Sequence, residues 1–214
     1  MQDNLHDYRK NYEKAKLTKD SVDPNPLQQF QTWFYEVQNA AIVDEANAMT
    51  LTTMGLDGFP KGRVVLLKKY DEHGFYFYTN YGSEKGKAIL KDNKVSLSFF
   101  WPGMERQILI KGVAEKTSAE DSENYFASRP KGSQIGARVS SQSEIVVSRK
   151  VLEDELNELE AKFESIDVPK PTNWGGYVVK AVEFEFWQGR PNRLHDRIRY
   201  RLEGLDWTID RLAP

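Results

Sequence analysis

Cysteine is absent from this sequence of 214 residues, and histidine occurs only three times. The lack of cysteine excludes disulfide bonds, thiolate metal ligands and cysteine nucleophiles. His6, His73 and His195 lie far apart and do not have the spacing of metal ligands. We therefore expect neither a metal site nor thiol chemistry.

Long apolar runs and a surplus of one charge are also lacking. No stretch approaches the roughly 20 apolar residues that span a bilayer, and the polar start of the chain lacks the apolar core of a secretory signal. We therefore expect a cytoplasmic protein with no membrane partner. The formal net charge is −2 at pH 7, whereas duplex-binding proteins usually carry a basic surplus, so no nucleic-acid partner is expected.

The length and composition are those of one ordinary globular domain. Hydrophobic residues make up 39% of the chain and charged residues 29%. A chain of this length can bury roughly 70% of its unfolded surface. Residues 1–22 show no clear periodicity and are predicted to be a mobile N-terminal segment. Residues 23–214 are predicted to form the single domain.

Periodic patterns predict a mostly β chain with peripheral helices. Apolar stripes and capping residues predict four helices, over residues 25–40, 83–93, 118–128 and 148–165. About eight strands are expected, over residues 48–54, 62–70, 75–80, 95–101, 106–115, 176–188, 197–203 and 207–212. Residues 132–143 are expected to be a polar loop. Because regular βαβ alternation is missing, a mostly antiparallel barrel or sheet is favoured.

Positive charge gathers beside a histidine near the end of the chain, in "FWQGRPNRLHDRIRY". Alternate side chains of an extended strand share a face, which would group Arg193, His195, Arg197, Arg199 and Arg201. One interpretation is a site for a small anion, because guanidinium groups suit phosphate and carboxylate. The other is an exposed strand face whose arginines pair with nearby acids. The stretch alone leaves both interpretations open.

A second candidate is "YTNYGSEKGKA", residues 78–88, where a strand passes into a helix. The N-terminus of a helix offers free backbone N–H groups and a favourable dipole to an anion, and Lys85 and Lys87 add positive charge. The spacing of its glycines and lysines is not that of a P-loop. An ordinary capped helix is the alternative interpretation.

Two further segments combine charged and hydroxyl side chains. Arg63 and Lys68 flank a strand that looks buried, and Tyr125, Arg129 and Ser133 follow one another at intervals of four residues around the end of a helix. Charged strand ends and helix ends are common, so each segment also has a purely structural interpretation. The usual motifs of serine hydrolases, zinc proteases and dinucleotide-binding folds are missing.

The order of the motifs is more specific than any one of them. The chain contains in succession "RVVLLK", "FYTN", "ERQ", "YFASRP", "SQIGARVSSQS", "WGG", "EFWQG", "RLHDR" and a terminal "W-x-I-x-RLAP". From about Phe30 to Pro214 this series resembles the pyridoxine/pyridoxamine 5'-phosphate oxidase family. The resemblance implies an FMN-binding split β-barrel and a homodimer with FMN bound between the two chains.

The resemblance also implies an activity. Members of the family oxidise pyridoxine 5'-phosphate or pyridoxamine 5'-phosphate to pyridoxal 5'-phosphate, a reaction of vitamin B6 biosynthesis and salvage. O2 accepts the electrons and becomes H2O2, and the amine substrate also releases ammonia. Hydride passes from the substrate's C4' to flavin N5, so the cofactor supplies the reactivity while the protein supplies orientation and electrostatics.

Site residues follow from the resemblance, motif by motif. The FMN contacts would be Arg63, Val64, Val65, Leu66, Leu67, Lys68, Tyr78, Thr79, Lys85, Gln107, Gln142, Ser143, Trp187 and Arg197. The substrate contacts would be Lys68, Tyr125, Arg129, Ser133, Arg193 and His195. Arg193 and His195 are the expected catalytic residues, and their roles in proton transfer stay open. The cations of "RLHDR" would then serve two phosphorylated ligands.

One position departs from the family pattern. Glu84 stands where the family usually has arginine, beside the expected phosphate ligand Lys85. A carboxylate cannot bond a phosphate directly, so the affinity for FMN is in question. Two alternative functions remain open. One is a flavin protein of the same fold that does not oxidise vitamin B6, and the other is a carrier of pyridoxal 5'-phosphate without flavin.

Overall fold

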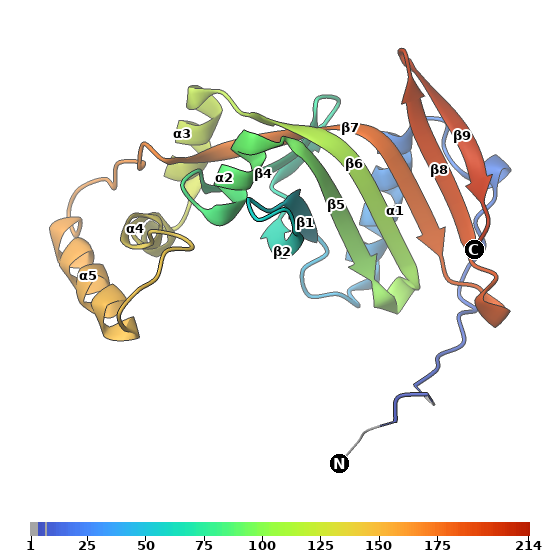
Figure 1. Cartoon of the computed structure of the whole chain (residues 1–214), viewed down its shortest axis with the longest axis horizontal. Helices are drawn as coiled ribbons and strands as arrows, with labels where there is room; N and C mark the ends of the chain where they lie inside the picture. Colours follow the sequence, from blue (N-terminus) through green and yellow to red (C-terminus); the bar gives the residue numbers. More distant parts are fainter. Residues whose placement is uncertain (1–3, 7) are drawn as a thin grey trace. The chain divides into compact units, whose positions relative to one another are not determined.

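The structure is a computed structural model that describes residues 4–6 and 8–214 (Figure 1). The strands are β1 (Ala48–Met54), β2 (Pro60–Leu66), β3 (Lys69–Asp71), β4 (Gly74–Asn80), β5 (Lys94–Trp101), β6 (Arg106–Lys116), β7 (Trp174–Gln188), β8 (Asp196–Glu203) and β9 (Asp206–Leu212). The α-helices are α1 (Pro26–Ala40), α2 (Glu84–Lys91), α3 (Ala119–Ser128), α4 (Lys131–Val139) and α5 (Arg149–Lys162). Short 3₁₀ turns cover Lys19–Ser21, Pro102–Met104 and Pro191–Arg193. None of the described helices is both long enough and apolar enough to cross a membrane.

The described strands form one sheet. Their order is β2-β1-β5-β6-β7-β4-β3, and β8 joins β7 to β9. The pairs β3–β4, β4–β7, β7–β8 and β8–β9 are antiparallel, as the sequence predicts. The prediction of a single strand over residues 62–70 is wrong, because β2 and β3 are separate strands. Between them Leu67 is buried, and the N–H of Lys68 donates to the carbonyl of Tyr76 in β4.

Two compact units make up the chain. The first comprises the chain up to Met49, Leu97–Lys111 and Ala181–Pro214, and the second comprises Thr50–Ser96 and Gly112–Lys180. Strands β1, β5, β6 and β7 pass from one unit into the other. The single domain over residues 23–214 and the mobile segment over residues 1–22 stay predictions, and residues 1–3 and 7 lie outside the described part.

Helix α1 supplies much of the core of the first unit. It begins after Asn25, whose side chain accepts a hydrogen bond from the N–H of Leu27. Phe30 packs on Phe99 of β5 with ring centroids 5.2 Å apart, and Trp33 lies edge-on to Phe186 of β7, also at 5.2 Å. The apolar stripe predicted for this helix therefore packs against the sheet.

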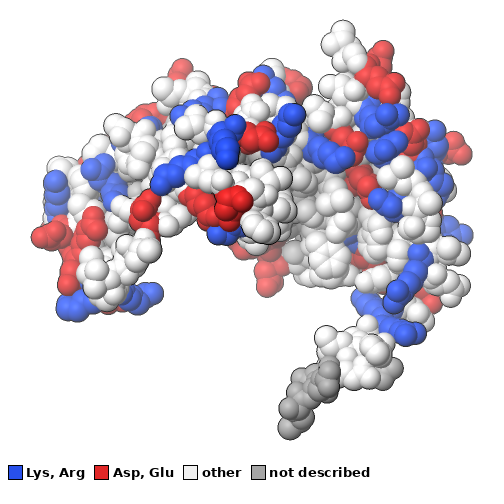
Figure 2. All heavy atoms as spheres, in the orientation of Figure 1, with Lys and Arg blue, Asp and Glu red and all other residues white. Residues whose placement is uncertain are grey.

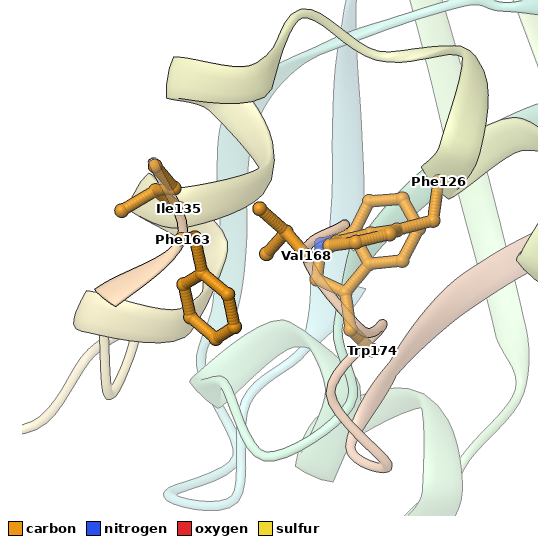
Figure 3. Packing of buried hydrophobic residues seen from close by; sticks show 5 residues of the cluster. All are labelled: Phe126, Ile135, Phe163, Val168 and Trp174. Carbon is orange, nitrogen blue, oxygen red and sulfur yellow. The ribbon is translucent and has the colours of Figure 1, made fainter. Parts of the chain in front are cut away.

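A separate apolar cluster lies among the helices of the second unit. It joins α3, α4, the end of α5 and the start of β7, and Figure 3 shows its buried members Phe126, Ile135, Phe163, Val168 and Trp174. Partly buried residues of α5, Leu156 and Leu159 among them, pack against this cluster. The amphipathic face predicted for residues 148–165 therefore contacts the cluster as expected.

Helix α4 corrects the polar loop predicted over residues 132–143. Ile135 is only 3% exposed within the cluster, and burying this side chain stabilises a helix whose other residues are mostly polar or small. The side-chain amide of Gln134 donates to the carbonyls of Phe126, Ala127 and Arg129 at 3.0–3.1 Å. It thereby supplies a donor to carbonyl groups at the end of α3, where the regular helical hydrogen bonds run out. Two glycines, Gly132 and Gly136, conceal this helix in the sequence, because glycine has a low helix propensity.

The outer face of α5 is charged. Arg149 pairs with Glu153 and Lys150 pairs with Asp154, both at i,i+4 spacing. Figure 2 shows acidic and basic side chains interspersed over this helix. Such exposed pairs contribute about 0.3–0.5 kcal/mol each, so α5 depends mainly on its packed face.

The structure of α4 predicts the effect of Gly136→Ala. A Cβ atom at position 136 would meet nothing within 4 Å. We expect the free energy of unfolding to rise by about 0.4–1 kcal/mol, because alanine restricts the unfolded chain and suits a helix. Chemical denaturation measures this change. Gly58→Ala, at a φ of 86°, is the control and should destabilise; a loss in the Gly136 variant would contradict a helix there.

Candidate functional site

The second unit contains a cationic pocket of about 680 Å³, a volume typical of a cofactor or substrate site. Its lining includes Arg63, Lys68, Lys85 and Arg129, and no lining residue is acidic. They come from β2, the residues after β2, the first turn of α2 and the end of α3. The fold therefore gathers four cations from distant parts of the sequence around one cavity.

Lys85 belongs to a buried polar group at the start of α2. The helix begins after Ser83, whose side chain accepts a hydrogen bond from the N–H of Gly86. The Lys85 ammonium donates to Gln142 Oε1 at 3.0 Å and to Thr79 Oγ1 at 3.3 Å. Lys85 is 9% exposed. Burial, together with the charge of Arg63, lowers the pKa of Lys85.

Arg63 is held against β1. Its Nη1 donates to Thr53 Oγ1 at 2.8 Å and to the carbonyl of Leu51 at 3.2 Å. Burial lowers the pKa of Arg63 and outweighs the opposing charge of Glu84. Among the predicted residues of this segment, Val64, Val65, Leu66 and Lys68 also line the pocket, whereas the buried Leu67 does not.

Arg129 lies at the other predicted phosphate site, together with Tyr125 and Ser133 in the lining of the same pocket. Its Nη1 is buried without a hydrogen-bond partner among the described residues. Burial lowers the pKa of this guanidinium. Tyr125 stacks on Tyr78 with ring centroids 3.8 Å apart.

These residues fit a phosphorylated ligand. Lys85 and Arg129 are desolvated cations whose charge is not matched by an acidic side chain of the pocket. Buried charge is costly unless it is paired, and a phosphate would supply the missing negative charge together with several hydrogen-bond acceptors. The start of α2 adds a favourable dipole.

Among the described residues no group of three His, Cys, Asp or Glu could hold a metal ion.

The remaining predicted residues lie elsewhere. Ser143 follows Gln142 with a φ of 77°. In the first unit lie Gln107, Trp187, Arg193, His195 and Arg197. Each of the two units therefore contains a part of the predicted site.

His195 and Arg193 line a pocket of about 470 Å³ with residues 8–12. The His195 Nδ1 accepts a hydrogen bond from the N–H of Arg190 at 3.1 Å. The rings of Trp187 and Tyr12 lie 4.7 and 5.7 Å from the imidazole. Burial, followed by the charge of Arg193, lowers the pKa of His195.

The alternation predicted from Arg193 to Arg201 holds only in part. Arg193 has a φ of 61° and belongs to the turn before β8, so it does not continue the strand. Within β8, Arg197 pairs with Glu185, Arg199 with Asp210, and Arg201 with Glu203 and Asp210. The interpretation as a strand face of paired arginines is confirmed for these three.

Three features escape the sequence analysis. Trp174 lines the cationic pocket, although the family resemblance implies no role for this residue. Glu84 is bound by Lys61, whose Nζ lies 2.6 and 2.9 Å from its two carboxylate oxygens. The backbone N–H groups of Glu13 and Lys14 donate to Glu105, which holds this part of the N-terminal segment in the first unit. No periodicity or short spacing could have indicated these long-range contacts.

The fold and the pocket define a β-rich protein with a cationic pocket suited to phosphorylated ligands, and comparisons identify its family. A family model described as "Pyridoxamine 5'-phosphate oxidase" matches residues 36–163. Another, "Pyridoxine 5'-phosphate oxidase C-terminal dimerisation region", matches residues 174–214. The chain belongs to the pyridoxine/pyridoxamine 5'-phosphate oxidase family, as the sequence motifs predict.

Individual relatives agree with this assignment. The chain is 57% identical to a pyridoxine/pyridoxamine 5'-phosphate oxidase of Flavobacterium johnsoniae, over 98% of each chain. A crystal structure of PhzG from Burkholderia lata, in complex with tetrahydrophenazine-1-carboxylic acid, matches with a TM-score of 0.86 and 27% identity, over 93% of this chain and 98% of the other. A Nostoc punctiforme FMN-binding protein matches in fold, with a TM-score of 0.69 and 13% identity over 90% and 100%. The predicted split-barrel fold class is confirmed.

Burial of the Lys85 ammonium leads to a prediction for the stability of the Lys85→Met variant. Because the pKa of Lys85 is lowered in the folded state, the ligand-free protein should gain stability as pH rises from that lowered pKa toward about 10.4, the value in the unfolded chain. We expect the stability of the variant to rise less with pH and its melting temperature near neutral pH to be higher. We also expect inorganic phosphate to stabilise the variant less than it stabilises the unmodified protein. Thermal denaturation across pH, with and without phosphate, measures all three effects.

The matched control is Lys87→Met, since Lys87 lies on the same helix, is half exposed and pairs with Glu144. It should leave the phosphate response intact. An unchanged phosphate response in the Lys85 variant would remove Lys85 from the anion site.

Proposed function

We propose that this protein is an FMN-dependent oxidase that converts pyridoxine 5'-phosphate or pyridoxamine 5'-phosphate to pyridoxal 5'-phosphate. O2 is the electron acceptor and becomes H2O2, and the amine substrate releases ammonia. The observation that carries the proposal is the cationic pocket. It combines the expected substrate residues Lys68, Tyr125, Arg129 and Ser133 with the expected cofactor residues around Lys85.

Lys85, Thr79 and Gln142 would hold the FMN phosphate, with Arg63 adding charge beside them. Their mutual hydrogen bonds set their positions before a ligand arrives, which reduces the entropy lost on binding. FMN, when bound, supplies the two-electron acceptor that the protein's own side chains lack.

Lys68, Tyr125, Arg129 and Ser133 would bind the substrate phosphate. That phosphate is remote from the carbon that is oxidised, so its binding energy serves to orient the pyridine ring. Arg129 is suited to this role because its buried Nη1 has no partner within the described chain.

Arg193 and His195 would act at the reacting end of the substrate. The His195 Nδ1 is occupied by the N–H of Arg190, which leaves Nε2 to meet a ligand. The lowered pKa favours the uncharged form of the ring at neutral pH. A neutral imidazole with Nδ1 as the acceptor carries its proton on Nε2, where it can donate to a substrate oxygen or nitrogen.

A homodimer would complete the site. The match to a C-terminal dimerisation region covers Trp187, Arg193, His195 and Arg197. We infer that FMN lies between two copies of the chain, so that the second unit of one copy and the first unit of its partner supply the two sets of residues. A purified protein that stays monomeric with FMN bound would contradict this arrangement.

The rival functions differ in what they require. A flavin protein that does not oxidise vitamin B6 needs no substrate set, yet Lys68, Tyr125, Arg129 and Ser133 all line the pocket. A carrier of pyridoxal 5'-phosphate needs no flavin. Oxygen consumption by the purified protein, with FMN and pyridoxine 5'-phosphate added, tests the proposal. Flavin binding without substrate-dependent oxygen uptake would favour the first rival, and failure to bind flavin would favour the second.

Arg129→Ala should impair recognition of the substrate phosphate. Losing a hydrogen bond to a charged group costs about 1.5–3 kcal/mol, or roughly 10- to 150-fold. We expect the loss mainly in KM, because the phosphate is bound in the ground state and in the transition state alike. Steady-state kinetics with both substrates measures it. Arg149→Ala, on exposed α5, is the control, and normal KM values in the Arg129 variant would exclude a phosphate contact.

Glu84→Arg should tighten FMN binding. The Glu84 carboxylate is held by Lys61 outside the pocket lining, and its charge opposes the lowering of the pKa that burial causes at Lys85 and Arg63. The exposed pair with Lys61 contributes at most about 1 kcal/mol, so little is lost when it is replaced. We expect a gain of roughly several-fold in affinity at low salt, because a new cation would act near the phosphate.

Fluorescence titration of the flavin-free protein with FMN, at low and high salt, measures this gain. Glu84→Gln removes the negative charge without adding a cation and should show a smaller gain. Equal or weaker FMN affinity in the arginine variant would mean that position 84 does not influence the phosphate site.

A further inference from the structure

The wall of the cationic pocket contains three nearly parallel aromatic rings. Tyr78 and Tyr125 stack with centroids 3.8 Å apart and planes 21° apart. Trp174 lies 5.7 Å from Tyr78 at 14° and 6.1 Å from Tyr125 at 7°. Both tyrosines belong to the expected site, whereas the function proposed above gives Trp174 no task.

Trp174 contacts the cation that would bind the substrate phosphate. The guanidinium carbon of Arg129 lies 4.8 Å from the centre of a Trp174 ring and 5.7 Å from that of Phe126. Arg129 forms no ion pair with an acidic side chain of the described residues, and its Nη1 has no hydrogen-bond partner there. Arg129 is therefore flanked by the faces of aromatic rings, whereas each arginine of β8 is paired with a carboxylate. Tryptophan is the aromatic residue that attracts a guanidinium most strongly.

The indole itself is firmly held. Trp174 is 6% exposed, and its ring lies edge-on to Phe126 with centroids 5.1 Å apart. Figure 3 labels both side chains within the cluster. Its backbone N–H donates to the carbonyl of Pro171 at 3.1 Å. It is the first residue of β7 and pairs with Asn80 of β4, next to the cofactor residue Thr79. The position of the ring is thus set by the sheet and by the apolar cluster.

Close backbone packing follows directly after it. A Cβ atom at Gly175 would lie 2.3 Å from the hydroxyl oxygen of Tyr81. Glycine at this position lets the start of β7 approach Tyr81 closely, and this fixes the strand from which Trp174 extends.

We propose that Trp174 is a positioning residue for the oxidase reaction, which holds the Arg129 guanidinium ready for the substrate phosphate. This inference rests on the proposed function. A carboxylate would hold the guanidinium equally well, but it would compete with the phosphate and neutralise the charge that attracts it. An aromatic face orients the cation and leaves its charge and N–H donors available.

Trp174→Phe and Trp174→Leu separate this role from packing. Both variants shorten the side chain within the cluster, but only phenylalanine retains an aromatic face toward Arg129. We expect the leucine variant to raise the KM for pyridoxine 5'-phosphate by about three- to thirtyfold, the range of a partly desolvated cation–π contact. The phenylalanine variant should recover much of this loss, and kcat and FMN affinity should stay near those of the unmodified protein.

A double variant tests whether Trp174 acts through Arg129. In an Arg129→Gln background, Trp174→Leu should raise KM no further, because the cation that it orients is gone. Phe163→Leu, in the same cluster, is the control for lost packing: it should lower the melting temperature without changing KM. An equal rise of KM in the phenylalanine and leucine variants, or additive effects in the double variant, would overturn the proposal and leave Trp174 a packing role.

Binding of inorganic phosphate to the FMN-loaded protein, measured by calorimetry, gives a readout that needs no turnover. Trp174→Leu should weaken it, and Trp174→Phe should weaken it less. If the unmodified protein binds phosphate through Arg129 but does not oxidise pyridoxine 5'-phosphate, the proposed function fails while the role of Trp174 is still tested. Phosphate affinity that is unchanged in the leucine variant would overturn the inference.

Discussion

Buried positive charge without a carboxylate partner is the constraint on which the site of this protein depends. Lys85 and Arg129 are desolvated in a pocket that has no acidic lining residue. Such burial opposes folding, because a charge loses its hydration without gaining a counter-ion. The ligand-free protein tolerates this cost through neutral acceptors around Lys85 and aromatic rings around Arg129. An anion that binds here stabilises the folded state by mass action, so ligand affinity and stability are coupled.

The architecture of the second unit explains how these cations are held. Strand β4 ends at Thr79 and Asn80, and α2 begins four residues later with Lys85 in its first turn. Antiparallel pairing with β7 brings Trp174 opposite Asn80, and the end of α3 places Arg129 over that indole. The correction at α4 belongs to the same arrangement, since Gln134 binds the carbonyls around Arg129. The site is therefore built from element ends, whose positions depend on the sheet and the apolar cluster.

The sequence predicts local structure well where a single periodicity dominates. Strands such as β1 and helices such as α1 and α5 lie close to their predicted ranges, because burial of one face determines their pattern. Helix α4 carries no clear periodicity, because Ile135 is its one buried residue and two glycines lower its helix propensity. Contacts such as that of Lys85 with Gln142 join residues far apart in the chain, and only the family resemblance placed them in one site. The Lys61–Glu84 pair had no local signal at all.

Pairing distinguishes two kinds of arginine that look alike in the sequence. Arg197 donates from Nε and Nη2 to the two carboxylate oxygens of Glu185, and from Nη1 to the carbonyl of Ala213. A guanidinium has five N–H donors, so Arg197 keeps free donors while its charge is balanced by Glu185. Arg129 keeps both its donors and its charge. If both meet phosphorylated ligands, Arg129 can attract the anion by charge, whereas Arg197 can contribute only the direction of its remaining hydrogen bonds. An arginine thus attracts an anion by its charge at position 129 and orients an anion by hydrogen bonds at position 197. The difference depends on whether an acidic side chain, such as Glu185, balances the charge.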